Sequence, residues 1–334
     1  MSSIQIAGDT SGSITLSAPA VAGANTITLP AVTGTILTTA YTGDVTFGGT
    51  LTVTDDATIN GLTVGKGANS VAANTALGVD ALDSGSLSGT NNTAVGYNAL
   101  LSNTTGASNV AVGKNTLDAN TTGNYNTGLG QGALGANVSG IDNTAVGQGS
   151  MGANTGSYNV AVGKTALTIN TTGEYNTAIG TAALYSNISA SNNTAVGYQA
   201  LYDNTTGGQN TAVGYLALAN NTTAANNSAL GNGALQLNTT GTSNTATGRQ
   251  ALYANTTGSY NTAVGQNALY YNTTAPNNVA VGYNALFNNT TASNNTAVGY
   301  TALFTNTTGQ YNTALGFGAL YQNQVHSGST AVGY

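Results

Sequence analysis

The chain has 334 residues, and its composition differs from that of an ordinary globular protein because only 4% of the residues are charged while 40% are hydrophobic. Disordered segments usually combine low hydrophobicity with high charge, so this composition argues against disorder. A net charge of -6 with four Lys and Arg residues leaves little to neutralise phosphates, which excludes nucleic acid and anionic membranes as expected partners.

Residues 1–40 contain short alternating runs, including AGDTSGSITL at 7–16 and TITLP at 26–30. These runs resemble the N-terminal segment of phage virion fibres. The resemblance implies a β-structured segment that attaches the chain to other virion proteins. Residues 41–70 continue with alternating runs punctuated by Gly, at 50–54 and 57–64, and we interpret them as an intertwined β connector.

From residue 71 to 334 the chain repeats one unit, and the Gly that closes each Asn-Thr-Ala-Val-Gly motif marks its phase. These marker glycines are Gly78, Gly96, Gly113, Gly130, Gly147, Gly163, Gly180, Gly197, Gly214, Gly231, Gly248, Gly265, Gly282, Gly299, Gly316 and Gly333. Their spacing is 17, except 18 before Gly96 and 16 before Gly163, where a turn has lost one Thr. A period this short with no helical pattern predicts an all-β parallel β-solenoid, or β-roll, of about sixteen coils.

Two positions of the repeat are expected to shape the corners of each coil. The Asn four residues before the marker is expected to form a hydrogen-bonded ladder from coil to coil, at Asn92, Asn109, Asn126, Asn143 and Asn295. The marker glycine suits a bend or a corner with positive φ, at Gly96, Gly113, Gly130, Gly147 and Gly299. An Asn-Thr-Thr-Gly motif seven residues after the marker supplies the second turn, where Asn and Gly tolerate the left-handed region.

The apolar positions of the repeat are expected to form the core. A branched apolar residue precedes the marker and Leu follows it by four residues, which predicts two core rows that include Val95, Leu100, Val112, Leu117, Val298 and Leu303. One coil would gain only about 4 to 6 kcal/mol from this burial, against roughly 1 to 2 kcal/mol of backbone entropy for every residue. We therefore expect ladders between coils and an interface between chains to supply the rest.

The unit Asn-Thr-Ala-Val-Gly-Tyr-Asn-Ala-Leu, at 92–100, resembles the head repeat of YadA-like trimeric adhesins. The resemblance covers about residues 71–334 and implies a left-handed parallel β-roll in which three chains pack side by side. The period here is longer than the usual adhesin coil, so the handedness and coil shape stay open. The physics of the sequence alone does not give the number three.

Candidate chemistry is sparse. Asp118, Asp142, Glu174 and Asp203 are the only acids after Asp83, and Asp142 and Glu174 would lie on the order of 10 Å apart, outside the usual separation of paired catalytic carboxylates. The chain has no Cys, one His at 326 and no run of about 18 apolar residues. We expect no enzyme activity, cofactor, metal site or membrane insertion.

Tyrosines recur in three rows: before the Asn row, directly after the marker, and after the core Leu. The row before Asn supplies the candidates for contact with a host receptor, which are Tyr125, Tyr158, Tyr175, Tyr260 and Tyr311. Tyrosine also packs well between subunits, which is the alternative role for these side chains.

The expected protein is therefore an elongated homotrimeric virion fibre, most readily a phage tail fibre, that projects toward a host-surface glycan or protein. Two alternatives remain. A bacterial trimeric surface adhesin would begin with a signal peptide, and the start Met-Ser-Ser-Ile-Gln-Ile lacks its basic and apolar stretches. An ice-binding β-solenoid would use the stacked Thr rows.

Overall fold

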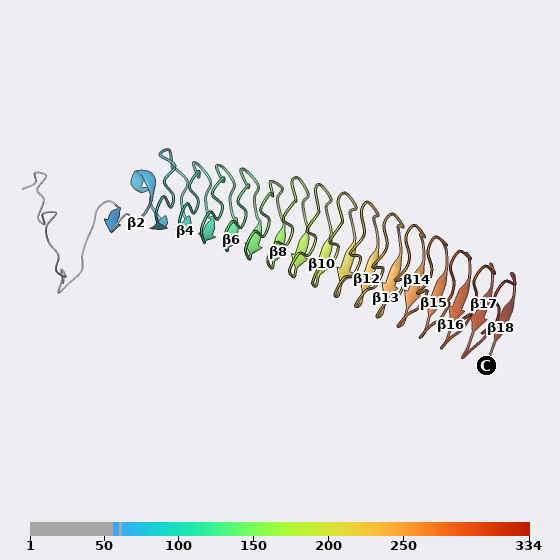
Figure 1. Ribbon diagram of the computed structural model, residues 1–334. Helices are drawn as coiled ribbons and strands as arrows, with labels where there is room; N and C mark the ends of the chain where they lie inside the picture. The colour runs from blue at the N-terminus through green and yellow to red at the C-terminus, as the bar shows by residue number, and fades with distance from the viewer. Residues whose placement is uncertain (1–55, 60–61) are drawn as a thin grey trace, which may run out of the picture. The chain divides into compact units, whose positions relative to one another are not determined.

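A computed structural model describes residues 56–59 and 62–334. The chain divides into two units, Met1–Thr52 and Val53–Tyr334, and the description concerns the second. The attachment segment expected at 1–40 and much of the connector expected at 41–70 lie outside the described residues. The described part is an all-β parallel solenoid, which confirms the expected fold class (Figure 1).

A small hairpin precedes the first coil. Strands β1 (Ala57–Ile59) and β2 (Leu62–Gly65) pair antiparallel, and a 3-10 turn, η1 (Ala68–Ser70), follows. Strand β2 also pairs antiparallel with β3 (Thr75–Gly78), the strand of the first coil. The hairpin therefore occupies a strand edge that the first coil would otherwise expose.

Each coil contributes one short strand to a single parallel sheet (Figure 1). After β3 these strands are β4 (Thr93–Val95), β5 (Val110–Val112), β6 (Thr127–Leu129), β7 (Thr144–Val146), β8 (Val160–Val162), β9 (Thr177–Ile179), β10 (Thr194–Val196), β11 (Thr211–Val213), β12 (Ser228–Leu230), β13 (Thr245–Thr247), β14 (Thr262–Val264), β15 (Val279–Val281), β16 (Thr296–Val298), β17 (Thr313–Leu315) and β18 (Thr330–Val332). Sixteen strands from β3 to β18 enclose about 15 complete turns of 17 residues.

The register keeps equivalent residues in line along the whole array. Ala94 pairs with Ala111, and this pairing of like positions continues to Ala314 with Ala331. The shortened repeat does not disturb it, because Ala145 still pairs with Ala161. The missing residue is therefore absorbed in a turn, as the sequence predicted.

Each strand places its middle residue inside the coil and its outer two residues outside. The middle residue is Ala in almost every strand, and Ala94 and Ala111 are fully buried. The Leu row is fully buried as well, at Leu100, Leu117 and Leu303. The expected core residues Val95, Val112 and Val298 are only partly buried. This corrects the second core row: side chains of a strand alternate in direction, so a residue next to the buried Ala must face outward.

Two ladders of buried asparagines line the rest of the interior. In the expected ladder, the backbone N–H of Asn109 donates to Oδ1 of Asn92 at 3.0 Å, and its Nδ2 donates to the carbonyl of Gly123 at 2.8 Å. A second ladder uses the Asn of the Asn-Thr-Thr-Gly turn: Nδ2 of Asn120 donates to Oδ1 of Asn103 at 2.9 Å and to the same Gly123 carbonyl at 3.1 Å. An amide both donates and accepts, so most members bond to the next coil, but in the second ladder Oδ1 of Asn137, beside the shortened repeat, and Oδ1 of Asn306 accept no hydrogen bond.

The marker glycines are corners with positive φ, as expected, at values of 129° to 139° for Gly96, Gly113, Gly130, Gly147 and Gly299. A Cβ on Gly96 would also lie 2.7 Å from the carbonyl oxygen of Gly113, so the stacked coils leave no room for a side chain.

The left-handed residues differ from those that the sequence predicted. Neither Asn103 nor Gly106 of the second turn has positive φ, whereas the core residues Leu100 and Leu117 do, at 52° and 51°. This conformation costs about 1 to 2 kcal/mol for a residue with a side chain. Burial of a Leu side chain, worth roughly 1.5 to 3 kcal/mol, offsets that cost.

One exception to the repeat explains another. The Ala row is interrupted by Gly128, where a Cβ would lie 2.5 Å from Cγ2 of Thr116. Thr116 itself replaces the Ala that most coils have three residues after the marker, and it is fully buried. The extra methyl group of Thr116 therefore occupies the space that Gly128 leaves open.

Candidate functional site

The outward side of the sheet, which we call the outer sheet face, is a continuous surface along the described coils. It consists of the first and third residues of strands β3 to β18. The first residue is Thr, Ser or Val, and the third is Val, Leu or Ile except at Thr247. Because the strands are in register, these residues form two straight rows along the described coils.

The outer sheet face is uncharged and combines an apolar row with a row that is mostly Thr. Its third-position row includes Leu129, Leu230 and Leu315, which are 47%, 52% and 48% exposed. No strand from β3 to β18 contains a charged residue. Scattered exposed apolar side chains are ordinary on monomers, whereas a contiguous apolar row is typical of surfaces that bind a partner.

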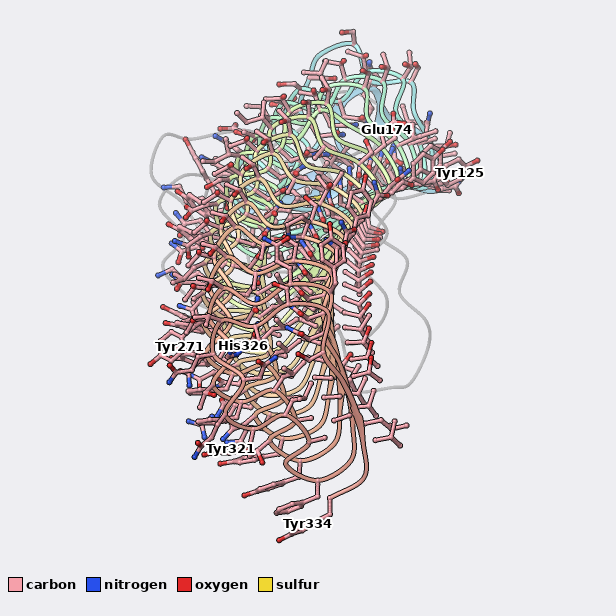
Figure 2. All side chains as sticks on the ribbon, turned by 90° about the vertical axis from the view of Figure 1, so that its right-hand side faces the viewer. Tyr125, Glu174, Tyr271, Tyr321, His326 and Tyr334 are labelled. Atoms are coloured by element: carbon pink, nitrogen blue, oxygen red, sulfur yellow. The ribbon has the colours of Figure 1, made fainter. Side chains whose placement is uncertain are left out.

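The tyrosines expected to contact a receptor lie outside the strands, each two residues before the first residue of a strand. Tyr125, Tyr260 and Tyr311 are 63%, 64% and 65% exposed. Tyr158 and Tyr175 stack on each other, with ring centroids 5.0 Å apart. Figure 2 shows Tyr125 and Glu174 at one corner of the coils, whereas Tyr271, Tyr321 and His326 project from the other side. Within this row, Tyr158 and Tyr175 therefore form one stacked pair, whereas the other three tyrosines are single rings.

Two further aromatic rows are continuous near the C-terminal end of the described coils. The first aromatic row directly follows the marker glycine and comprises Tyr283, Tyr300, Phe317 and Tyr334, with successive centroid distances of 5.1, 5.0 and 5.3 Å. The second aromatic row comprises Tyr253, Tyr270, Phe287, Phe304 and Tyr321, with distances of 5.1 to 5.3 Å. The spacing follows from one ring per coil.

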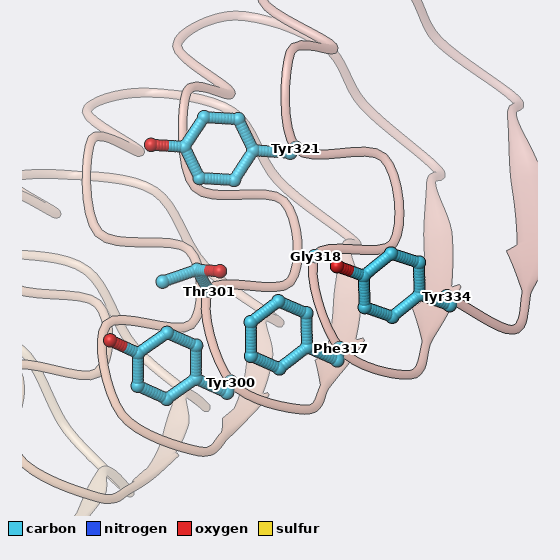
Figure 3. Close-up of a pocket in the computed structure, with 6 residues that line it drawn as sticks. All are labelled: Tyr300, Thr301, Phe317, Gly318, Tyr321 and Tyr334. Atoms are coloured by element: carbon cyan, nitrogen blue, oxygen red, sulfur yellow. The ribbon is translucent and has the colours of Figure 1, made fainter.

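A shallow groove of about 530 Å³ lies against the last rings of both rows. Tyr300, Phe317 and Tyr334 line one side, Tyr321 lines the other, and Thr301 and Gly318 lie between them (Figure 3). A Cβ on Gly318 would meet nothing within 4 Å. Sequence reasoning noticed the tyrosine rows but missed this groove, because Phe at three positions hid their continuity.

In the described part of the chain, the acidic side chains form no cluster that could hold a metal ion. Residues 56–59 and 62–334 contain no group of three or more His, Cys, Asp or Glu side chains that could hold a metal ion. Burial raises the pKa of Asp118, although backbone hydrogen bonds from Asp118 and Ala119 oppose the shift, and burial raises the pKa of Asp203. Burial also raises the pKa of Tyr270 in the second aromatic row, and the neighbouring Tyr253 and Tyr271 add to the shift.

No helix among the described residues is long and apolar enough to cross a membrane. Comparison of the chain with protein-family models, with curated proteins and with solved structures finds no match.

Proposed function

We propose that this chain is the subunit of a homotrimeric virion fibre, most readily a phage tail fibre, that reaches from the particle to the host surface. The observation that supports the proposal best is the outer sheet face, which runs the length of the described coils with branched apolar side chains and no charge. Burial of such a stripe against copies of the same chain would add apolar contact to every coil.

The interior of the coil supports an assembly in the same way. The inward side chains of a typical coil are one Leu, two Ala and two Asn, so each coil by itself buries little apolar surface. Repeat proteins gain stability from neighbouring units. Copies of the chain packed on the outer sheet face would add contacts between chains to the contacts between coils, and would stiffen the rod.

Attachment to a receptor would then be multivalent. Three chains display each exposed ring three times, and linked weak contacts bind much more tightly than single ones. The N-terminal segment, which resembles that of phage fibres, would hold the other end on the particle.

Thiol labelling tests the proposed interface directly, because the natural chain has no Cys. Val213→Cys places a thiol on the outer sheet face, and Tyr215→Cys, two residues later, places one at a side chain that is 51% exposed. In the native assembly we expect maleimide to label Tyr215→Cys quickly and Val213→Cys slowly. Equal labelling rates for both variants in a trimer would show that the interface between chains does not cover the outer sheet face.

The Thr row of the same face favours the second candidate function, ice binding. Thr177, Thr194 and Thr211 lie in register on adjacent strands, so hydroxyl and methyl groups repeat along a regular line. This function requires the outer sheet face to be free. If the chain is a monomer, is labelled quickly at Val213→Cys and shows thermal hysteresis, the results would support ice binding and contradict the fibre proposal.

A further inference from the structure

The two aromatic rows lie in a part of the chain that is rich in aromatic residues and has no acidic or basic side chains of the Asp, Glu, Lys or Arg type. Residues 250–334 contain no Asp, Glu, Lys or Arg. The same segment contains nine of the 18 tyrosines and three of the four phenylalanines. Aromatic density is therefore greatest where formal charge is absent.

The first aromatic row presents its rings as a platform. The planes of Tyr283 and Tyr300 differ by 14°, those of Tyr300 and Phe317 by 7°, and those of Phe317 and Tyr334 by 7°. The rings are stacked, and Figure 3 shows Tyr300, Phe317 and Tyr334 offset from one another along the row. The parts of these rings that border the groove are available to a ligand.

The floor of the groove is rigid and carries few but well-placed polar groups. The backbone N–H of Thr301 donates to the carbonyl of Tyr283 at 2.9 Å, and that of Gly318 donates to the carbonyl of Tyr300 at 2.9 Å. Thr301, Tyr300 and Tyr321, which line the groove, each carry a hydroxyl group (Figure 3). Ligand sites commonly combine apolar walls with a small number of orienting polar groups in this way.

We infer that this groove, between Tyr300 and Tyr334, binds an uncharged linear glycan whose sugar rings pack against the parts of the aromatic rings that border the groove. A sugar has an apolar C–H face that fits an aromatic ring and hydroxyl groups at its edge that meet the tyrosine and threonine hydroxyls. Nucleic acid bases also stack on aromatic rings, but they carry phosphates that require basic side chains. The nearest Lys or Arg in sequence is Arg249, outside the segment.

This inference rests on the proposed attachment function and names its ligand class. Affinity electrophoresis of the full chain tests it, in native gels that contain mannan, dextran or hydroxyethylcellulose, with dextran sulfate and an oligo-dT strand as charged probes. We expect at least one neutral polysaccharide to retard the wild-type chain. The double variant Tyr300→Ala, Phe317→Ala should weaken this binding roughly tenfold for each ring removed.

A matched control uses the same repeat position elsewhere. Tyr198 and Tyr215 also follow marker glycines and stack with centroids 5.5 Å apart, but they form an isolated pair. The variant Tyr198→Ala, Tyr215→Ala should be retarded like the wild type. Equal loss in both double variants, no retardation by any neutral polysaccharide, or stronger binding to a charged probe would overturn the inference.

The mass of each assembly separates this inference from the fibre proposal. A trimeric wild type that binds no neutral polysaccharide would contradict the glycan groove alone. A monomeric wild type that loses binding only in Tyr300→Ala, Phe317→Ala would support the groove and contradict the fibre.

Discussion

Replacement of Gly128 by Ala should destabilise the coil in which it lies, although it restores the residue found at that position in the other coils. The new Cβ would lie 2.5 Å from Cγ2 of Thr116, whereas carbon atoms in good contact are about 3.5 to 4.0 Å apart. The next neighbours, the carbonyl oxygen of Ala133 and Cδ1 of Leu117, would be at 3.5 and 3.6 Å. The methyl group of Thr116 is therefore the only close obstacle.

Thr116 has little freedom to move away. Its hydroxyl donates to the carbonyl of Gly130 at 2.7 Å, and the side chain is fully buried. Overpacking of this kind costs about 1 to 3 kcal/mol, and the reduced entropy of the unfolded chain returns roughly 0.4 to 1 kcal/mol. We expect Gly128→Ala to lower the local free energy of unfolding by about 1 to 2 kcal/mol.

The double variant Gly128→Ala, Thr116→Ala should recover most of that loss. Thr116→Ala alone opens a small cavity and removes the hydrogen bond to Gly130, which we expect to cost roughly 1 to 2 kcal/mol. In the double variant the Cβ of the new Ala fills that cavity, and the two coils match the pair formed by Ala99 and Ala111. The two substitutions should therefore be coupled by about 1 to 3 kcal/mol.

Hydrogen exchange of peptides that cover residues 110–135 measures this coupling locally, which is preferable because long repeat arrays need not unfold in one step. The control is Gly135→Ala, whose Cβ would come no closer than 3.4 Å to the carbonyl oxygen of Gly132. It should leave exchange nearly unchanged. Effects of Gly128→Ala and Thr116→Ala that add within about 0.5 kcal/mol would refute the compensation.

Three further substitutions test other parts of the coil. Asn126→Ala should cost about 1 to 3 kcal/mol, because it leaves the buried N–H of Asn143 unpaired while the carbonyl of Gly140 keeps its hydrogen bond from Nδ2 of Asn137, and faster hydrogen exchange in the adjoining coils would show the loss. Gly248→Ala should cost more than about 1 to 3 kcal/mol, because it combines a φ of 130° with a Cβ 2.6 Å from the Gly265 carbonyl; an unchanged melting temperature would contradict this. Asp118 has a raised pKa in the folded chain, so its contribution to folding stability is fully present below its unfolded pKa and is lost as the pH rises through the folded pKa. Asp118→Asn should therefore raise the melting temperature more at neutral pH than at acidic pH, and thermal melts at both pH values would show this.

The repeat itself could be predicted because most of its positions are occupied by one residue type with one physical role. Ala in the strand centre, Asn at the corner and Gly at the marker each satisfy a demand that recurs every 17 residues, and Asn109 and Gly113 show both the expected ladder and the expected φ. The 16-residue repeat before Gly163 could be assigned to a turn, since a deletion in the strand would have reversed every side chain.

The remaining features depend on geometry that the pattern does not carry. Val95 was assigned to the core for its hydrophobicity, although its place beside the buried Ala94 requires the opposite side of the sheet. Asn103 was interpreted as a turn residue, and nothing in Asn-Thr-Thr-Gly shows that its amide lies inside the coil and shares the Gly106 carbonyl with Asn92. Left-handed Leu100 contradicts its intrinsic preference and arises because the tight corner turns the side chain inward.

The mass of the native assembly, measured by light scattering on the full chain, tests the central claim most directly. The account predicts three times the chain mass of 32.9 kDa, in particles that negative-stain imaging shows as slender rods. A stable monomer of 32.9 kDa with its outer sheet face open to solvent would contradict the trimeric fibre.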